Sequence, residues 1–126
     1  MKKILILVFS ILISFNSYGE WEEFGKNVDG DTFYIDEDTI KEHNGYVYWW
    51  VLVDRLKPSE SGIMSGKTYT QGDCGVNQYK WLSIIQYKQP MGEGSSETIT
   101  PPAKWKYPPP DSIGGGLLKY VCDYVD

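Results

Sequence analysis

The chain has 126 residues, of which 41% are hydrophobic and 15% aromatic, and its formal net charge at pH 7 is −5. This length fits one domain. Nucleic acids and anionic membrane surfaces would repel an acidic protein, so we expect no nucleic-acid partner and no binding to anionic membrane surfaces.

The first 19 residues have the layout of a secretory signal peptide. A positive segment, an apolar run and a short polar stretch follow one another: Lys2 and Lys3, Ile4–Ile13, and Ser14–Gly19. We expect cleavage before Glu20, which leaves residues 20–126 as a single domain and shifts the net charge from −5 to −7 as both lysines are lost.

The apolar run is shorter than the roughly 20 residues that cross a bilayer. We therefore expect a periplasmic or secreted protein without stable membrane insertion. No cysteine follows the run, so no lipid anchor of the bacterial lipoprotein kind is expected.

Runs of β-branched and aromatic residues between turn signals predict an antiparallel sheet of about five or six strands. The expected strands are Glu20–Lys26, Thr32–Ile35, Tyr46–Lys57, Ile63–Cys74, Gln78–Lys88 and, at one edge, Ser96–Thr100. Asn27–Asp31 and Asn44-Gly45 carry the residues that tolerate the positive φ of tight turns. Asp36–Glu42 predicts a turn or one short helical turn.

The last part of the chain predicts a connector and then a helix. Pro101–Pro110 is rich in proline, which cannot donate a hydrogen bond to a strand ladder, so we expect an extended connector. Asp111 or Ser112 then caps a helix. Its apolar side is formed by Ile113, Leu117, Leu118, Val121, Cys122 and Val125. Gly114–Gly116 weaken the first turns, so either the helix starts later or the glycines permit close packing on the sheet. The expected fold class is α+β, with this helix packed on one face of the sheet.

Cys74 and Cys122 are the only two cysteines, and an exported chain favours a disulfide bond between them. A reactive thiol pair usually has Cys-x-x-Cys spacing, which these residues lack. Closing so long a loop would stabilise the fold by about 4 kcal/mol in the chain-entropy model. The bond would tether the C-terminal helix to the sheet.

No constellation of residues indicates a reaction. His43 is the only histidine and lies in a polar segment, so a solvated side chain is the favoured interpretation. One histidine and two bonded cysteines disfavour zinc. The acidic run Asp29–Asp38 lacks the glycine and glutamate positions of an EF-hand calcium loop. We expect a non-enzymatic protein without metal or cofactor, and a small hydrolase built on His43 and these carboxylates is the weaker alternative.

Large rings dominate the predicted strands, and Trp and Tyr are enriched in binding surfaces. Because side chains alternate along a strand, one apolar set is expected to face the helix: Val47, Trp49, Val51, Val53, Leu82 and Ile84. The candidate binding residues are the rings expected on the opposite, helix-free face: Tyr46, Tyr48, Trp50, Tyr79, Trp81 and Tyr87. For any single ring, the alternative is that it fills the core.

Several short motifs, taken in order, resemble the surface-adhesin protein E-like domains of Gram-negative bacteria. They are Trp21, Phe33–Asp36 with Thr39-Ile40, Tyr48–Leu52, Cys74, Trp105 before a proline-rich step, and Ser112 leading to Val121-Cys122. The resemblance implies an antiparallel sheet with a disulfide-tethered helix, and a binding protein rather than an enzyme. The family's named member is an outer-membrane lipoprotein adhesin that binds host matrix and serum proteins and can dimerise. This sequence lacks the cysteine that would carry the lipid.

We therefore expect an exported binding module whose partner is a protein, of the envelope or of a host matrix, or a hydrophobic small ligand. A homodimer is compatible with the exposed rings. A structural or assembly role in the cell envelope is the alternative, with the aromatic face as a permanent subunit interface.

Overall fold

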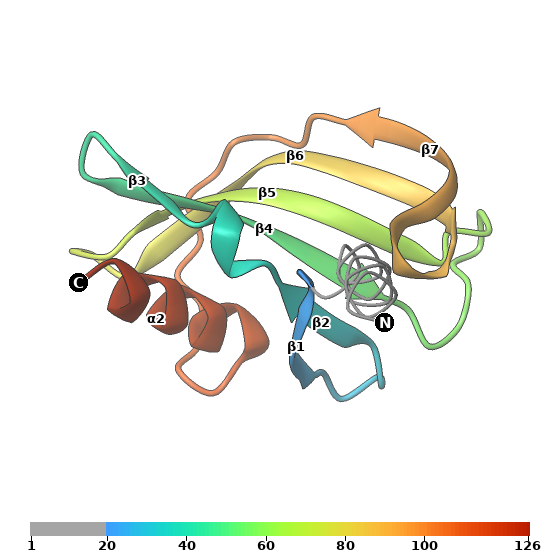
Figure 1. Cartoon of the computed structure of the whole chain (residues 1–126), viewed down its shortest axis with the longest axis horizontal. Helices are drawn as coiled ribbons and strands as arrows, with labels where there is room; N and C mark the ends of the chain where they lie inside the picture. Colours follow the sequence, from blue (N-terminus) through green and yellow to red (C-terminus); the bar gives the residue numbers. More distant parts are fainter. Residues whose placement is uncertain (1–19) are drawn as a thin grey trace, which may run out of the picture.

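The computed structural model describes residues 20–126, and the predicted signal peptide lies outside the described residues. Antiparallel strands form one sheet in the order β1-β2-β4-β5-β6-β7, and β3 pairs with a second stretch of β4 (Figure 1). The strands are β1 (Glu22–Lys26), β2 (Thr32–Ile35), β3 (Lys41–His43), β4 (Tyr46–Asp54), β5 (Ser65–Asp73), β6 (Gln78–Gln89) and β7 (Glu93–Ile99). The helices are η2 (Glu37–Thr39), η3 (Pro90–Gly92) and α2 (Ile113–Val125). The expected α+β class is confirmed.

The strand β3 is an addition to the predicted sheet. It lies along the same edge of β4 as β2, and the 3-10 helix η2 joins the two short strands. Between them the hydroxyl of Thr39 accepts a hydrogen bond from the backbone N–H of Trp50 at 3.2 Å. Asp36 caps η2 by accepting from the N–H of Asp38 at 3.0 Å. The residues of β3 are all polar and exposed, so the sequence there shows no alternation of apolar residues that would predict a strand.

The core lies between α2 and one face of the sheet. Its buried residues are Ile35, Ile40, Val47, Trp49, Val51, Leu117, Leu118 and Val121. Figure 1 shows α2 on one side of the sheet, beside β4 and β5. Gly72 of β5 permits this approach, because a Cβ there would lie 2.8 Å from Leu118 and 2.9 Å from Trp49. Of the predicted bed for the helix, Val47, Trp49 and Val51 are confirmed as core.

The helix begins at the predicted cap. The hydroxyl of Ser112 accepts a hydrogen bond from the N–H of Gly115 at 3.0 Å, and α2 starts at Ile113. The glycines of its first turn therefore allow close packing rather than delaying the helix. A Cβ on Gly116 would lie 3.3 Å from the ring of Phe24. Within residues 20–126, no helix combines the length and apolar character needed to cross a membrane.

Two contacts fix α2 to the rest of the domain. The predicted disulfide between Cys74 and Cys122 is confirmed, with a Cα–Cα distance of 5.9 Å and a sequence separation of 48. Nearby on the helix, the hydroxyl of Tyr120 donates a hydrogen bond of 2.5 Å to the carboxylate of Glu37 in η2. This bond raises the pKa of Tyr120 to about 12, with burial as a smaller cause.

Candidate functional site

A β-bulge in β6 divides the predicted set of rings between the two faces of the sheet. Thr70 pairs with Trp81 while Tyr69 pairs with Ser83, so Leu82 is an extra residue in β6. Such an insertion reverses the phase of side-chain alternation. Tyr87 therefore points to the opposite face from Trp81.

The expectation that all the candidate rings share the helix-free face is wrong for Tyr79 and Trp81. Both line a cavity on the helix side, together with Trp49 and Leu117. Tyr46, Tyr48 and Trp50 alternate with the core residues of β4 and lie on the helix-free face. Tyr87 lies there too.

We call the helix-free cluster the aromatic face, and it consists of Tyr46, Tyr48, Trp50, Tyr69, Tyr87 and Trp105. At its centre, the ring of Tyr69 in β5 stacks between two rings of β4. The centroid distances are 6.0 Å to Tyr48 and 5.0 Å to Trp50. Gln71 donates a hydrogen bond of 3.1 Å to the hydroxyl of Tyr48. The stack is thus positioned by cross-strand pairing, and its rings remain partly exposed.

Lysine side chains extend the aromatic face at both ends. Trp105 of the proline-rich connector lies 5.7 Å from the ring of Tyr46, and the Nζ of Lys80 lies 4.5 Å from the Trp105 ring. At the other end, the Nζ of Lys67 lies 5.3 Å from the ring of Tyr87 and 5.7 Å from that of Trp21. These distances are in the range of cation–π interactions.

The β6–β7 hairpin covers part of the same face. The hydroxyl of Ser65 donates to the carbonyl of Gln89 at 2.6 Å and accepts from the N–H of Gly92 at 2.8 Å. These bonds hold η3 against the sheet, and Leu52 beneath it is fully buried. The ring stack and Trp105 stay partly exposed beside this covered region.

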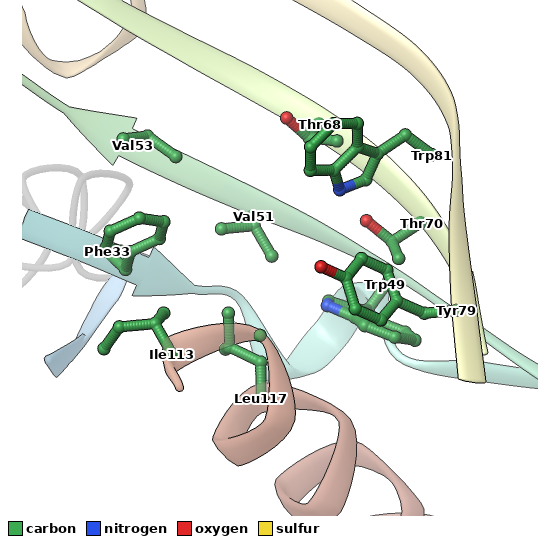
Figure 2. A pocket seen from close by; sticks show the side chains of 11 residues that line it. Phe33, Trp49, Val51, Val53, Thr68, Thr70, Tyr79, Trp81, Ile113 and Leu117 are labelled. Atoms are coloured by element: carbon green, nitrogen blue, oxygen red, sulfur yellow. The ribbon is translucent and has the colours of Figure 1, made fainter. Parts of the chain in front are cut away.

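On the helix side, a cavity of about 250 Å³ lies between the start of α2 and strands β2, β4, β5 and β6. Figure 2 shows the side chains of Phe33, Val51, Tyr79, Trp81, Ile113 and Leu117 around it. Burial raises the pKa of the Tyr79 hydroxyl above its usual value. Trp81, at 37% exposure, forms the outer wall.

The residues of the hydrolase alternative are not gathered in a site. His43 is exposed in β3, and its ring contacts the amide of Asn44 at 3.1 Å. The nearby carboxylates support turns: Asp31 accepts from the N–H of Leu56 at 3.0 Å, and Asp36 caps η2. Among residues 20–126, no group of three or more His, Cys, Asp or Glu side chains is arranged to hold a metal ion.

Sequence reasoning missed Tyr69 and Trp105 as members of the aromatic face. Tyr69 lies between two threonines in a predicted strand. This pattern places its ring on one face of the strand but does not show which rings of other strands lie beside it. Trp105 reaches the sheet because the connector pairs with β6, where Tyr79 and Lys106 exchange hydrogen bonds of 2.7 and 3.0 Å. Only the non-local pairing reveals either contact.

The fold and the site define a class of protein: a disulfide-tethered α+β domain with a partly exposed aromatic sheet face. The family model for surface-adhesin protein E matches residues 21–123, and the chain belongs to this family. No curated protein matches the chain.

Solved structures of Haemophilus influenzae protein E have the same fold. Crystal form II of that protein aligns with a TM-score of 0.60 and 19% identity, covering 83% of this chain and 88% of the other. Protein E from non-typeable Haemophilus influenzae aligns with a TM-score of 0.57 and 18% identity, covering 82% and 76%. The family match over residues 21–123 confirms the resemblance seen in the sequence motifs.

Proposed function

We propose that this protein is an exported, non-enzymatic binding module that recognises a protein partner through the aromatic face. The observation that carries the proposal is the stack of Tyr48, Tyr69 and Trp50, which stays partly exposed on the side of the sheet that α2 does not cover. Rings held in a rigid sheet lose little conformational entropy on binding, and Trp and Tyr are the residues that most often dominate binding energy.

The lysines narrow the chemistry of the partner. Lys80 and Lys67 place positive charge beside the rings of a chain whose net charge is −5. A segment that presents apolar or aromatic side chains next to carboxylates would complement such a surface. The family name supports a partner outside the cell, and a protein of the host matrix or of the cell envelope fits it.

Three single variants test the role of the face. Trp50→Ala and Tyr69→Ala remove rings from the stack, and Tyr107→Ala removes a ring that is 71% exposed outside the face. Binding of residues 20–126 to immobilised matrix and envelope proteins would be measured by surface plasmon resonance. Loss of a central ring typically costs about 2 kcal/mol, or roughly thirtyfold in affinity. The control should bind like the wild type.

Equal binding by all three variants would contradict the proposal. Light scattering after size-exclusion chromatography distinguishes binding of a partner protein from a structural role in which the face is a subunit interface. A wild-type dimer that Trp50→Ala converts to a monomer would show that the face joins two copies of this chain.

We also propose that residues 1–19 direct export and are removed before Glu20, leaving residues 20–126 as the mature single domain. The basic and apolar pattern of this segment supports the proposal, together with membership in a surface-adhesin family. N-terminal sequencing of protein recovered from the periplasm or medium should begin at Glu20. A different first residue, or retention in the membrane after a salt wash, would contradict it.

A further inference from the structure

The cavity beneath α2 carries an inference that is independent of the aromatic face. We propose that it binds a small, mostly apolar molecule of about one aromatic ring, which carries an oxygen that accepts a hydrogen bond from the indole Nε1–H of Trp49. The two sites lie on opposite faces of the sheet, so each can be tested without the other.

The first observation is an unpaired donor. Trp49 is 2% exposed, and its Nε1 is the one buried side-chain nitrogen or oxygen within residues 20–126 that has no hydrogen-bond partner. Most buried polar groups are paired, and an unpaired one needs an explanation. Figure 2 shows this nitrogen at the end of the indole nearer to Leu117, a residue that also lines the cavity.

The second observation is the size and lining of the cavity. Its volume is about 250 Å³, and a cavity of about 150 Å³ in another protein already holds benzene. Phe33, Val51, Val53 and Leu117 supply apolar walls. A ring with a short polar substituent therefore fits both the space and the chemistry.

Gly114 keeps the cavity open beside a second donor, the hydroxyl of Tyr79. A Cβ on Gly114 would lie 2.9 Å from the hydroxyl oxygen of Tyr79, so the glycine at the start of α2 preserves this corner. The hydroxyl of Thr70, a residue that is 3% exposed, belongs to the same lining. Trp49, Tyr79 and Thr70 thus offer donors at one end of a mostly apolar cavity.

Access is provided at the outer wall. Trp81 is the most exposed ring of the lining, and the Nζ of Lys106 lies 4.6 Å from it. A ligand would enter on this side, where the lining borders solvent.

Acetophenone and isopropylbenzene are matched probes, because they have similar shapes and only the first carries an acceptor oxygen. We expect acetophenone to shift the Trp49 indole N–H resonance in ¹⁵N correlation spectra saturably, with little change at Trp50 and Trp105. The resonances are assigned with single Trp→Phe variants. In Trp49→Phe, the affinity ratio of acetophenone to isopropylbenzene should fall about fivefold, which corresponds to one hydrogen bond.

A second pair of variants does not depend on Trp49→Phe folding well. Thr68→Phe places a ring in the cavity and should abolish binding of both probes, whereas Thr98→Phe on exposed β7 should leave it unchanged. Four results would overturn the proposal: no saturable shift, a shift at Trp50 or Trp105 instead, equal binding by Thr68→Phe, or a bound water on Trp49 that acetophenone does not displace.

Discussion

Trp49 and Trp50 are neighbours in the chain, and their side chains lie on opposite faces of β4. Trp49 is 2% exposed and packs in the core beneath α2. Trp50 stacks on Tyr69 at 5.0 Å on the helix-free face. The alternation of a strand thus gives two adjacent indoles different surroundings and, by our proposals, different ligands.

The two indoles should respond differently to truncation. Trp49→Ala leaves a cavity in the core and should lower the free energy of unfolding by about 3–5 kcal/mol. Trp50→Ala removes a partly exposed ring and should cost clearly less stability. Urea unfolding followed by circular dichroism measures both. A greater loss for Trp50→Ala would mean that Trp50 is core and would remove the main support for the aromatic face.

Loss of the disulfide should loosen α2 before it loosens the sheet. In a Cys74→Ser/Cys122→Ser double variant, the lost loop closure should reduce stability by up to about 4 kcal/mol. Amide hydrogen exchange should rise first across residues 117–125, because the sheet keeps its own ladder of hydrogen bonds. A uniform rise in exchange across β4, β5 and α2 would show that the helix and sheet open as one unit.

Close packing at Gly72 gives a sharper stability test. In Gly72→Ala the new methyl group would lie 2.8 Å from Leu118 and 2.9 Å from Trp49, so it should push α2 away from the sheet. We expect a loss of about 1–3 kcal/mol from such overpacking. Gly75→Ala is the control, because its nearest contact would be 3.4 Å, to the carboxylate of Asp73. Equal stability of the two variants would be inconsistent with this packing.

The contact between Tyr120 and Glu37 predicts a dependence on alkaline pH. The folded-state pKa of Tyr120 rises from 10.0 to about 12, chiefly through the hydrogen bond to Glu37, since ionisation would remove the donated proton. The stability it contributes is therefore fully present below pH 10 and is lost as the pH rises toward 12. Wild type should be more stable than Tyr120→Phe at pH 8, and this difference should shrink by pH 11.

Urea unfolding at pH 8, 9, 10 and 11 measures the effect. Tyr107→Phe serves as control, because it removes a phenol hydroxyl from an exposed residue and leaves the Tyr120–Glu37 bond intact. A difference between wild type and Tyr120→Phe that stays constant through pH 11 would rule out this source of stability.

The sequence alone predicts features that depend on residues close together in the chain, and features that depend on the cellular compartment expected from the signal-peptide pattern. Ser112 was identified as one of two candidate caps, because the helix that follows shows its apolar spacing. The bond between Cys74 and Cys122 follows from the signal-peptide pattern of residues 1–19 and from their being the only two cysteines. The separation of Trp49 from Trp50 followed from alternation along one strand. The ordered motifs also carried the resemblance that places the chain in its family.

The tertiary structure decided how those local patterns combine. The extra residue Leu82 reverses the phase of β6, so Tyr79 and Trp81 line the cavity while Tyr87 reaches the helix-free face. Tyr69 and Trp105 join the aromatic face through pairing with distant strands. Side-chain alternation is a local property of one strand, whereas its phase relative to the core is set by hydrogen bonds between strands far apart in the chain. Those bonds alone determine which rings surround a cavity and which remain available to a partner.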